Sequence, residues 1–354
     1  MSSNLFQSII IRSITFNNRI VVSPMCQYSA EDGFANDWHL VHLGSRAVGG
    51  AGLVFTEATA VSPEGRISPG DIGLWKDEQI TMLQRIAGFI AQQGSVPGIQ
   101  LAHAGRKASC EASWLGGKQL SIAAGGWPVL APSAIPFKEE QVPVIAMSVT
   151  QIQEVIAQFK MAARRALQAG FKVVEIHAAH GYLIHQFLSP YSNHRTDVYG
   201  GSFDNRIKLL LEIVNAVQQE WPSELPLFVR ISATDWIENG WQLNDSVALT
   251  KILKEIGVDV IDCSSGGNVL HAKIPVAPNY QVPFAAAIKK ETKILTGAVG
   301  LITQPEQAEN ILLEQQADFI FMAREMLRNP YFPQQAAKFF NETILWPKQY
   351  ERAK

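Results

Sequence analysis

The chain has 354 residues, of which 47% are hydrophobic and 18% charged, and its formal net charge at pH 7 is -2. This balanced charge excludes a strongly basic nucleic-acid-binding surface, and no apolar run approaches the roughly 20 residues of a membrane span. The first residues lack the features of a secretory signal, so we expect a cytoplasmic enzyme. The three cysteines, Cys26, Cys110 and Cys263, match neither a disulfide framework nor a zinc motif.

Eight short runs of mainly apolar residues recur along the chain, with helical patterns between them. In chain order they begin at Ile20, Leu53, Val96, Val173, Pro226, Val258, Thr292 and Ala317. Each run is continuously apolar, which is typical of parallel strands buried on both faces. Eight β/α units predict an α/β protein with a single (β/α)8 barrel, a TIM barrel, that spans residues 1–354 as one domain.

Several helices between these runs have recognisable ends. Ser148 and Gln151 form a capping-box pattern, and Gly170 stands where a helix end needs a residue with positive φ. A second helix is predicted to start at Thr303 and Pro305.

Two segments depart from the β/α alternation. Residues 8–20 predict a small hairpin at the bottom of the barrel, before the first barrel strand. Residues 110–132 show no convincing periodicity and follow the third strand, at the barrel mouth. Long connections of this kind are often functional, so we favour a lid over the substrate, with a plain surface excursion as the alternative.

Reactive residues in such barrels lie at the carboxyl ends of the strands, and the fourth strand ends in His177 and His180. This pair could bind a metal, form hydrogen bonds within the core, or donate jointly to a substrate oxygen. We favour joint donation, because no third ligand stands at metal-motif spacing. Tyr182, two residues further on, is then a candidate general acid.

The ends of strands seven and eight indicate a phosphate site. Residues 296–300 contain two glycines that allow close approach of a ligand to backbone N–H groups, and Arg324 can add a positive charge. A phosphorylated cofactor would then lie across the barrel mouth. Arg230, at the end of strand five, would stabilise negative charge on a reduced flavin, or would form a buried ion pair.

Long motifs in the same order resemble the Old Yellow Enzyme family of FMN-dependent ene-reductases, and more narrowly its thermophilic-like branch. The resemblance covers essentially the whole chain. The motifs are SPMCQY at Ser23, TEATAVSPEGRI at Thr56, GIQLAHAGRK at Gly98, EIHAAHGYLIHQFLSP at Glu175, SNHRTDVYGGSFDNR at Ser192, LFVRISATD at Leu227, TGAVG at Thr296 and AREMLRNP at Ala323.

The resemblance implies non-covalent FMN, NADPH or NADH as the hydride donor, and electrophilic alkenes as substrates, with no metal. The implied FMN contacts are Ser23, Pro24, Met25, Cys26, Ala58, Gln100, Arg230, Val299, Gly300, Ala323 and Arg324. His177 and His180 would hold the substrate oxygen, Tyr182 would protonate the α-carbon, and Cys26 would adjust the flavin potential.

Further implications concern specificity and assembly. Tyr28 would line the substrate pocket. Arg352, in the tail of residues 346–354, would reach the active site of a neighbouring subunit in a homodimer or homotetramer. The chain departs from the family pattern at Ala323, where glycine is usual, and at Val299, where xenobiotic reductase carries a tryptophan.

Two other functions stay open on the residues alone. One is a lyase that uses the histidine pair for a metal or Lys107 for a Schiff base. The other is a flavin redox sensor that uses Cys26 as its switch. Related flavin barrels with an iron–sulfur cluster are excluded, because they need a further domain and a cysteine cluster.

Overall fold

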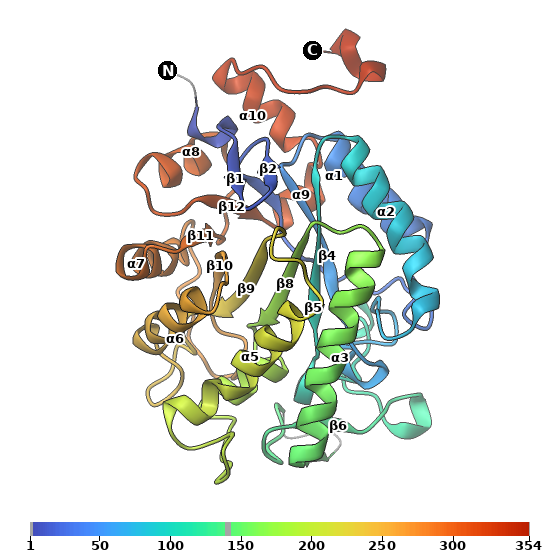
Figure 1. Cartoon of the computed structure of the whole chain (residues 1–354), viewed down its shortest axis with the longest axis vertical. Helices are drawn as coiled ribbons and strands as arrows, with labels where there is room; N and C mark the ends of the chain where they lie inside the picture. Colours follow the sequence, from blue (N-terminus) through green and yellow to red (C-terminus); the bar gives the residue numbers. More distant parts are fainter. Residues whose placement is uncertain (1–2, 139–142, 354) are drawn as a thin grey trace.

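The structure is a computed structural model that describes residues 3–138 and 143–353. Eight parallel strands close into a barrel, and each predicted run contributes one of them (Figure 1). In chain order they are β3 (Ile20–Val22), β4 (Leu53–Ala60), β5 (Val96–Ala102), β8 (Val173–Ala178), β9 (Leu227–Ser232), β10 (Val260–Ser264), β11 (Leu295–Ala298) and β12 (Phe319–Met322). The predicted TIM barrel is confirmed.

Helices surround the barrel. They are α1 (Asp37–Val48), α2 (Ile80–Gln92), α3 (Val149–Gln168), α4 (Leu183–Leu188), α5 (Phe203–Gln218), α6 (Leu243–Glu255), α7 (Val282–Thr292), α8 (Pro305–Leu313), α9 (Arg324–Arg328) and α10 (Phe332–Phe340). Short 3-10 helices lie at Asn4–Phe6, Pro63–Gly65, Asp77–Gln79, Gly105–Lys107, Ser113–Leu115, Ile122–Ala124 and Lys348–Ala353. No helix in the described parts of the chain is long and apolar enough to cross a membrane.

Local signals explain where these helices begin and end. Ser148 and Gln151 form the expected capping box of α3, and Gly170 follows that helix with a φ of 88°. The start of α8 was predicted one residue too early. Gln304 is its N-cap, whereas the Thr303 N–H donates to the side chain of Gln307.

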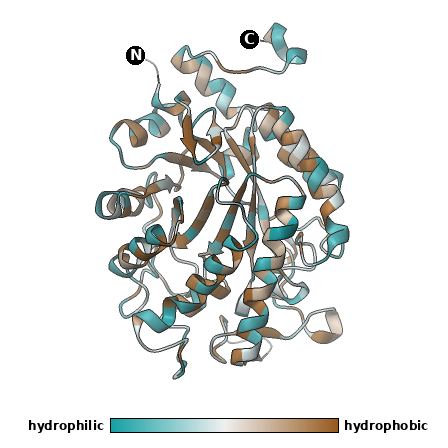
Figure 2. Cartoon of the chain, in the orientation of Figure 1, coloured by the Kyte–Doolittle hydropathy of each residue, from teal (hydrophilic) through white to brown (hydrophobic). Residues whose placement is uncertain are grey.

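The barrel strands separate two buried layers. Side chains such as Val21, Phe55 and Phe228 fill the interior, whereas Ile20 and Val22 pack outward against the helices. Successive residues of a strand point to opposite faces, so a continuous apolar run serves both layers. Figure 2 shows the result, with hydrophobic strands at the centre and hydrophilic residues on the outer helices.

The predicted N-terminal hairpin is also confirmed. It consists of β1 (Ile9–Ile11) and β2 (Ile14–Phe16), which pair antiparallel. Phe16 is fully buried, and its ring centroid lies 5.3 Å from that of Phe319 at the start of β12. The hairpin therefore covers the amino-terminal end of the barrel and leaves the opposite end for the site.

The segment at residues 110–132 has more structure than its sequence predicted. It contains two short 3-10 helices and β6 (Val129–Ala131), which pairs in parallel with β7 (Val144–Ala146). Two of its residues connect it to the barrel mouth. The Trp127 indole N–H donates to the Glu64 carbonyl, and the Trp114 ring lies 5.7 Å from that of Tyr28. Its sequence hides this order, because three-residue strands are too short to show periodicity.

Buried His42 on α1 gives the fold an acid-sensitive point. Burial, with a smaller contribution from Arg46, lowers its pKa from 6.5 to about 3. A lowered folded-state pKa means that the unfolded chain binds the proton more tightly. The contribution of neutral His42 to the free energy of unfolding is therefore complete above pH 6.5, and it is lost as the pH falls toward 3.

Protonation of His42 in the unfolded chain should lower the free energy of unfolding at pH 5 by about 2 kcal/mol relative to pH 7. Urea unfolding at pH 7 and pH 5 checks this. The His42→Gln variant should lose about 2 kcal/mol less than the wild type between the two pH values. His194→Gln, at an exposed histidine, is the control. An unchanged pH dependence in His42→Gln would contradict the assignment.

Candidate active site

The histidine pair lies at the carboxyl end of β8, as the sequence predicted. The ring centroids of His177 and His180 are 5.2 Å apart with an interplanar angle of 87°. The Tyr182 ring lies 5.0 Å from that of His177, also edge-on. Three hydrogen-bonding side chains therefore meet at one point of the barrel mouth.

Both histidines are neutral at neutral pH. Burial, followed by the positive charge of Arg230, lowers the pKa of each well below its ordinary value. His177 Nδ1 accepts the Ala179 N–H at 3.2 Å, which leaves the proton on Nε2. His180 Nε2 lies 2.7 Å from Ser264 Oγ. A neutral imidazole has one N–H, so His177 can give one hydrogen bond to a ligand oxygen from Nε2. His180 can give one from Nδ1 when the Ser264 hydroxyl donates to its Nε2.

Tyr182 keeps its proton. Burial, with Cys26 as the next cause, raises the pKa of its phenol well above the ordinary value. A group that stays protonated over the working pH range can serve as a proton donor.

The turn that carries these residues is held by unusually close backbone contacts. His180 has a φ of 58°, and Gly181 follows with a φ of 71°. A Cβ on Gly181 would lie 2.3 Å from the Gly267 carbonyl oxygen. Lys107 Nζ donates to the carbonyls of His180 and Gly267, at 2.8 and 3.0 Å. Lys107 therefore links the His180 turn to the loop after β10.

A group of buried charges lies between the same strands. Arg230 Nε is 2.8 Å from Asp262 Oδ2. Arg230 therefore forms a buried ion pair, which was the second of the two roles predicted for it. Gln100 donates to Glu175 Oε1 at 2.8 Å. Burial and Asp262 raise the pKa of Glu175 well above its usual range, whereas the pKa of Asp262 rises only to about 6. Asp262 is therefore the carboxylate that balances Arg230, and the flavin role of Arg230 stays a prediction.

The segment after β3 follows the rim of the mouth. Ser23 is buried and its Oγ has no hydrogen-bond partner in the described residues. Pro24, Met25, Cys26 and Tyr28 are partly buried. Burial, followed by Asp71, raises the pKa of the Cys26 thiol well above its ordinary value. The thiol is therefore protonated at neutral pH, which makes it a weak nucleophile.

The ends of β11 and β12 form a small hollow of about 120 Å³. Val299, Gly300, Ala323 and Arg324 line it, as predicted for the phosphate end. Gly300 has a φ of 140°, and the guanidinium of Arg324 makes no ion pair or hydrogen bond with the described residues. Gly297 does not line this hollow, and a Cβ there would lie 2.3 Å from the ring of Phe321.

Arg352 lies far from these residues in its own chain. It belongs to the 3-10 helix Lys348–Ala353, where the Tyr350 ring contacts that of Tyr331 at 6.3 Å. Figure 1 shows this tail at the same end of the molecule as the N-terminus, opposite the end of the barrel that carries β6. Arg352 therefore cannot serve the active site of its own barrel in this arrangement.

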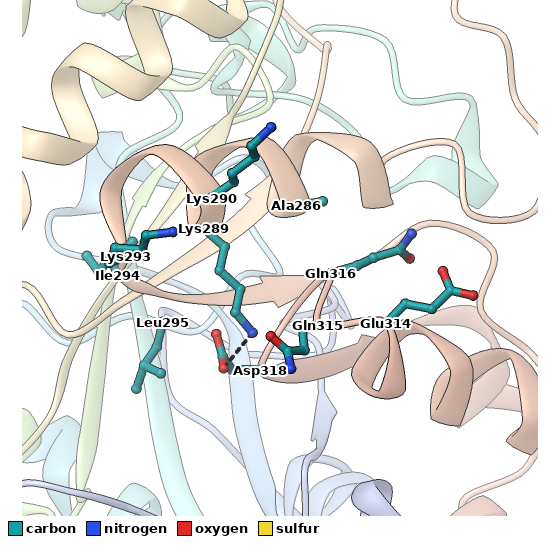
Figure 3. A pocket seen from close by; sticks show the side chains of 10 residues that line it. All are labelled: Ala286, Lys289, Lys290, Lys293, Ile294, Leu295, Glu314, Gln315, Gln316 and Asp318. Atoms are coloured by element: carbon teal, nitrogen blue, oxygen red, sulfur yellow. Dashed lines mark hydrogen bonds and ion pairs between the residues drawn. The ribbon is translucent and has the colours of Figure 1, made fainter.

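A further hollow, of about 490 Å³, lies between α7 and the segment before β12 (Figure 3). Its lysines include Lys289, which is paired with Asp318 at 2.9 Å. It adjoins the amino-terminal ends of β11 and β12, away from the histidine pair. Within the described residues, no group of three or more His, Cys, Asp or Glu side chains could hold a metal.

Comparison with known proteins supplies the family. A model of the NADH:flavin oxidoreductase / NADH oxidase family matches residues 4–342. The chain belongs to this family, the Old Yellow Enzyme family. It is 51% identical over 353 residues to an NADPH dehydrogenase of Listeria innocua, with 99% of each chain covered. It is 49% identical over 354 residues to an NADPH dehydrogenase of Bacillus subtilis, again with 99% of each covered.

Solved structures agree with this assignment. An old yellow enzyme homologue from Zymomonas mobilis matches with a TM-score of 0.78 and 26% identity, over 97% of this chain and 94% of that one. A 2-naphthoyl-CoA reductase matches with a TM-score of 0.87 and 27% identity, over 95% of this chain and 52% of that one. The chain thus falls in the thermophilic-like branch of the family, together with these bacterial NADPH dehydrogenases.

The described residues fit the FMN that this family implies. The buried Ser23 Oγ lacks a hydrogen-bond partner among the described residues, and the exposed Arg324 lacks a counter-ion there. Buried polar atoms are rarely left unpaired, so Ser23 Oγ indicates a polar ligand, and the exposed cation of Arg324 suits a phosphate. FMN offers such a ligand, because its isoalloxazine edge and its phosphate both accept hydrogen bonds.

Ser264 is a residue of the site that sequence reasoning missed. It ends β10, and its Oγ lies 2.7 Å from His180 Nε2 and 3.3 Å from Gln281 Oε1. Its one proton goes to His180 when that ring gives its own N–H to a ligand. Its position at the end of the sixth barrel strand was the available signal, since site residues gather at these ends.

Proposed function

We propose that the protein is an FMN-dependent ene-reductase that uses NADPH to reduce activated carbon–carbon double bonds of α,β-unsaturated carbonyl or nitro compounds. The observation that carries this proposal is the meeting of two neutral imidazoles and one protonated phenol at the end of β8. Donors fixed in advance around a developing negative charge lower the barrier of a reaction.

When bound, FMN would supply the hydride chemistry between NADPH and the β-carbon of the alkene. We assign the flavin contacts to Ser23, Pro24, Met25, Cys26, Ala58, Gln100, Arg230, Val299, Gly300, Ala323 and Arg324. Ser23, Gln100 and Arg230 lie on or beside the barrel strands, whereas Arg324 supports the phosphate end.

The protein residues supply polarisation and a proton. His177 and His180 hold the carbonyl or nitro oxygen, which withdraws electrons from the double bond. Tyr182 delivers its phenolic proton to the α-carbon. Tyr28, with Trp114 packed against it, limits the pocket on the side of residues 110–132, and we propose that this segment covers the bound substrate.

Two alternatives fit the geometry less well. A Schiff-base lyase needs a free amine, but Lys107 Nζ is engaged by two carbonyl oxygens. A thiol sensor needs an accessible thiolate, but burial raises the pKa of Cys26.

An anaerobic visible spectrum tests the proposal. The purified protein should be yellow, should bleach with NADPH, and should regain its colour with 2-cyclohexenone. Bleaching without recovery would reject the ene-reductase substrate class but keep the flavin enzyme. A colourless protein that does not take up FMN would reject the cofactor.

We further propose that Arg352 completes the active site of a neighbouring subunit. Its distance from its own barrel mouth supports this, and the charge suits an anionic or carbonyl ligand. Arg352→Ala should lower enone turnover by about tenfold through the lost charge-assisted contact.

Subunit mixing distinguishes action across subunits from action within one. Refolding Arg352→Ala together with the His177→Ala/His180→Ala variant creates hybrids in which one site has both histidines and the neighbour's Arg352. The turnover of these hybrids should exceed that of either variant alone. Mixtures without such a gain would show that Arg352 does not act across subunits.

A further inference from the structure

A hollow on the side of the barrel mouth that carries Arg106 has a volume of about 810 Å³. It lies between Gly116–Gln119, residues 135–138 and the loop at residues 268–271. It adjoins the site through Lys107, whose Nζ lies 5.0 Å from the Tyr182 ring centroid and 4.6 Å from that of Phe137. Phe137 belongs to its lining, so the hollow continues outward from the proposed substrate pocket.

The lining carries positive charge. Arg106, Lys118 and Lys138 line the hollow, and the lining residues that the structure describes include no aspartate or glutamate. Arg106 is only 1% exposed, and its guanidinium donates to the carbonyls of Ile135 and Asn268 and to the Asn268 side chain. Neither Arg106 nor Lys107 forms an ion pair with a carboxylate in the described residues.

Burying a cation without a counter-ion costs free energy, because the lost hydration is not replaced. The pKa values of Arg106 and Lys107 reflect this cost. Burial lowers the pKa of Arg106 from 12.5 to about 10 and that of Lys107 from 10.5 to about 8. An anionic ligand in the hollow would offset this cost.

We propose that this hollow receives the adenosine end of NADPH and that Lys118 binds its 2′-phosphate. The inference rests on the proposed function and deepens it by explaining a preference for NADPH over NADH. Hydride donor and alkene would use the same pocket in turn, and of the two only the nucleotide has a long anionic extension. Arg106 supplies fixed positive charge at the floor, and Lys118 lies exposed at the rim.

Lys118 is the better rim lysine to test. Its side chain makes no hydrogen bond or ion pair among the described residues, so its removal leaves the fold intact. Its carbonyl accepts the Glu111 N–H, a contact that alanine retains. In the sequence Lys138 is followed by Glu139 and Glu140, which lie outside the described residues.

Calorimetric titration of the FMN-loaded enzyme tests the proposal without turnover. The probes are adenosine 2′,5′-bisphosphate and 5′-AMP, which differ only in the 2′-phosphate. The wild type should bind the bisphosphate at least about tenfold more tightly, because charge-assisted hydrogen bonds are worth that much. Lys118→Ala should remove most of the difference, and Lys118→Arg should retain it.

The matched control is Lys290→Ala, in the hollow of Figure 3, which should leave the difference unchanged. Equal binding of the two probes by the wild type, or a full difference in Lys118→Ala, would overturn the proposal. In turnover, Lys118→Ala should lower the NADPH-to-NADH ratio of kcat/KM by about tenfold. If the proposed ene-reductase function is wrong, 2-cyclohexenone will not reoxidise the reduced enzyme. That result does not depend on how tightly the two probes bind.

Discussion

Replacing His177 and His180 together by alanine is expected to slow the reoxidation of reduced enzyme by 2-cyclohexenone at least about a hundredfold, since one oxyanion donor alone is commonly worth that factor. Both rings are neutral and close enough to share one oxygen, with centroids 5.2 Å apart. Phenolic ligands, which offer an oxygen to the same donors, should bind more weakly. Stopped-flow absorbance and ligand titration measure the two effects.

A conservative variant separates hydrogen bonding from loss of structure. His180 has a φ of 58°, a conformation that asparagine tolerates better than most residues. His180→Asn retains an N–H donor and should recover much of the rate that His180→Ala loses. Unchanged enone turnover in the double alanine variant would eliminate the oxygen-holding role of the pair.

Tyr182→Phe is expected to slow the same reoxidation step by about a hundredfold, the lower range for loss of a general acid. Reduction by NADPH needs no proton from this side chain and should proceed at nearly the wild-type rate. Single-turnover measurements of the two half-reactions check this. Equal slowing of both would assign Tyr182 to binding instead of proton transfer.

The pH dependence offers a second check on Tyr182. Burial raises the pKa of its phenol, so the proton stays in place across neutral and mildly alkaline pH. The wild-type reoxidation rate should therefore show no loss as the pH rises from 7 to about 9, since an unperturbed tyrosine already titrates near 10. A decline centred in that range would indicate a different proton donor.

The β/α order of the chain was readable from the sequence because its signals are local. Strands buried on both faces need continuous apolar runs, and helix ends need caps such as Ser148 and a positive-φ residue such as Gly170. The His177, His180 and Tyr182 cluster was also predictable. Its members lie within six residues at one strand end, so their proximity does not depend on distant parts of the chain.

The errors of the sequence-based prediction concern segments that are too short to show a detectable pattern. The strand β6 has only three residues, which pair with β7, and the N-cap Gln304 makes no side-chain cap hydrogen bond. Segments of this length carry too few residues to distinguish a strand or helix start from a loop.

By itself the sequence determined the closed barrel, the family and the histidine pair, because apolar periodicity and contiguous motifs specify them. Tertiary structure alone decided that Arg230 pairs with Asp262, that Ser264 contacts His180, and that Arg106 and Lys118 line one hollow. It also placed Arg352 at the far end of the barrel. Barrel closure is the physical reason, since it brings together the ends of strands that are far apart in the chain.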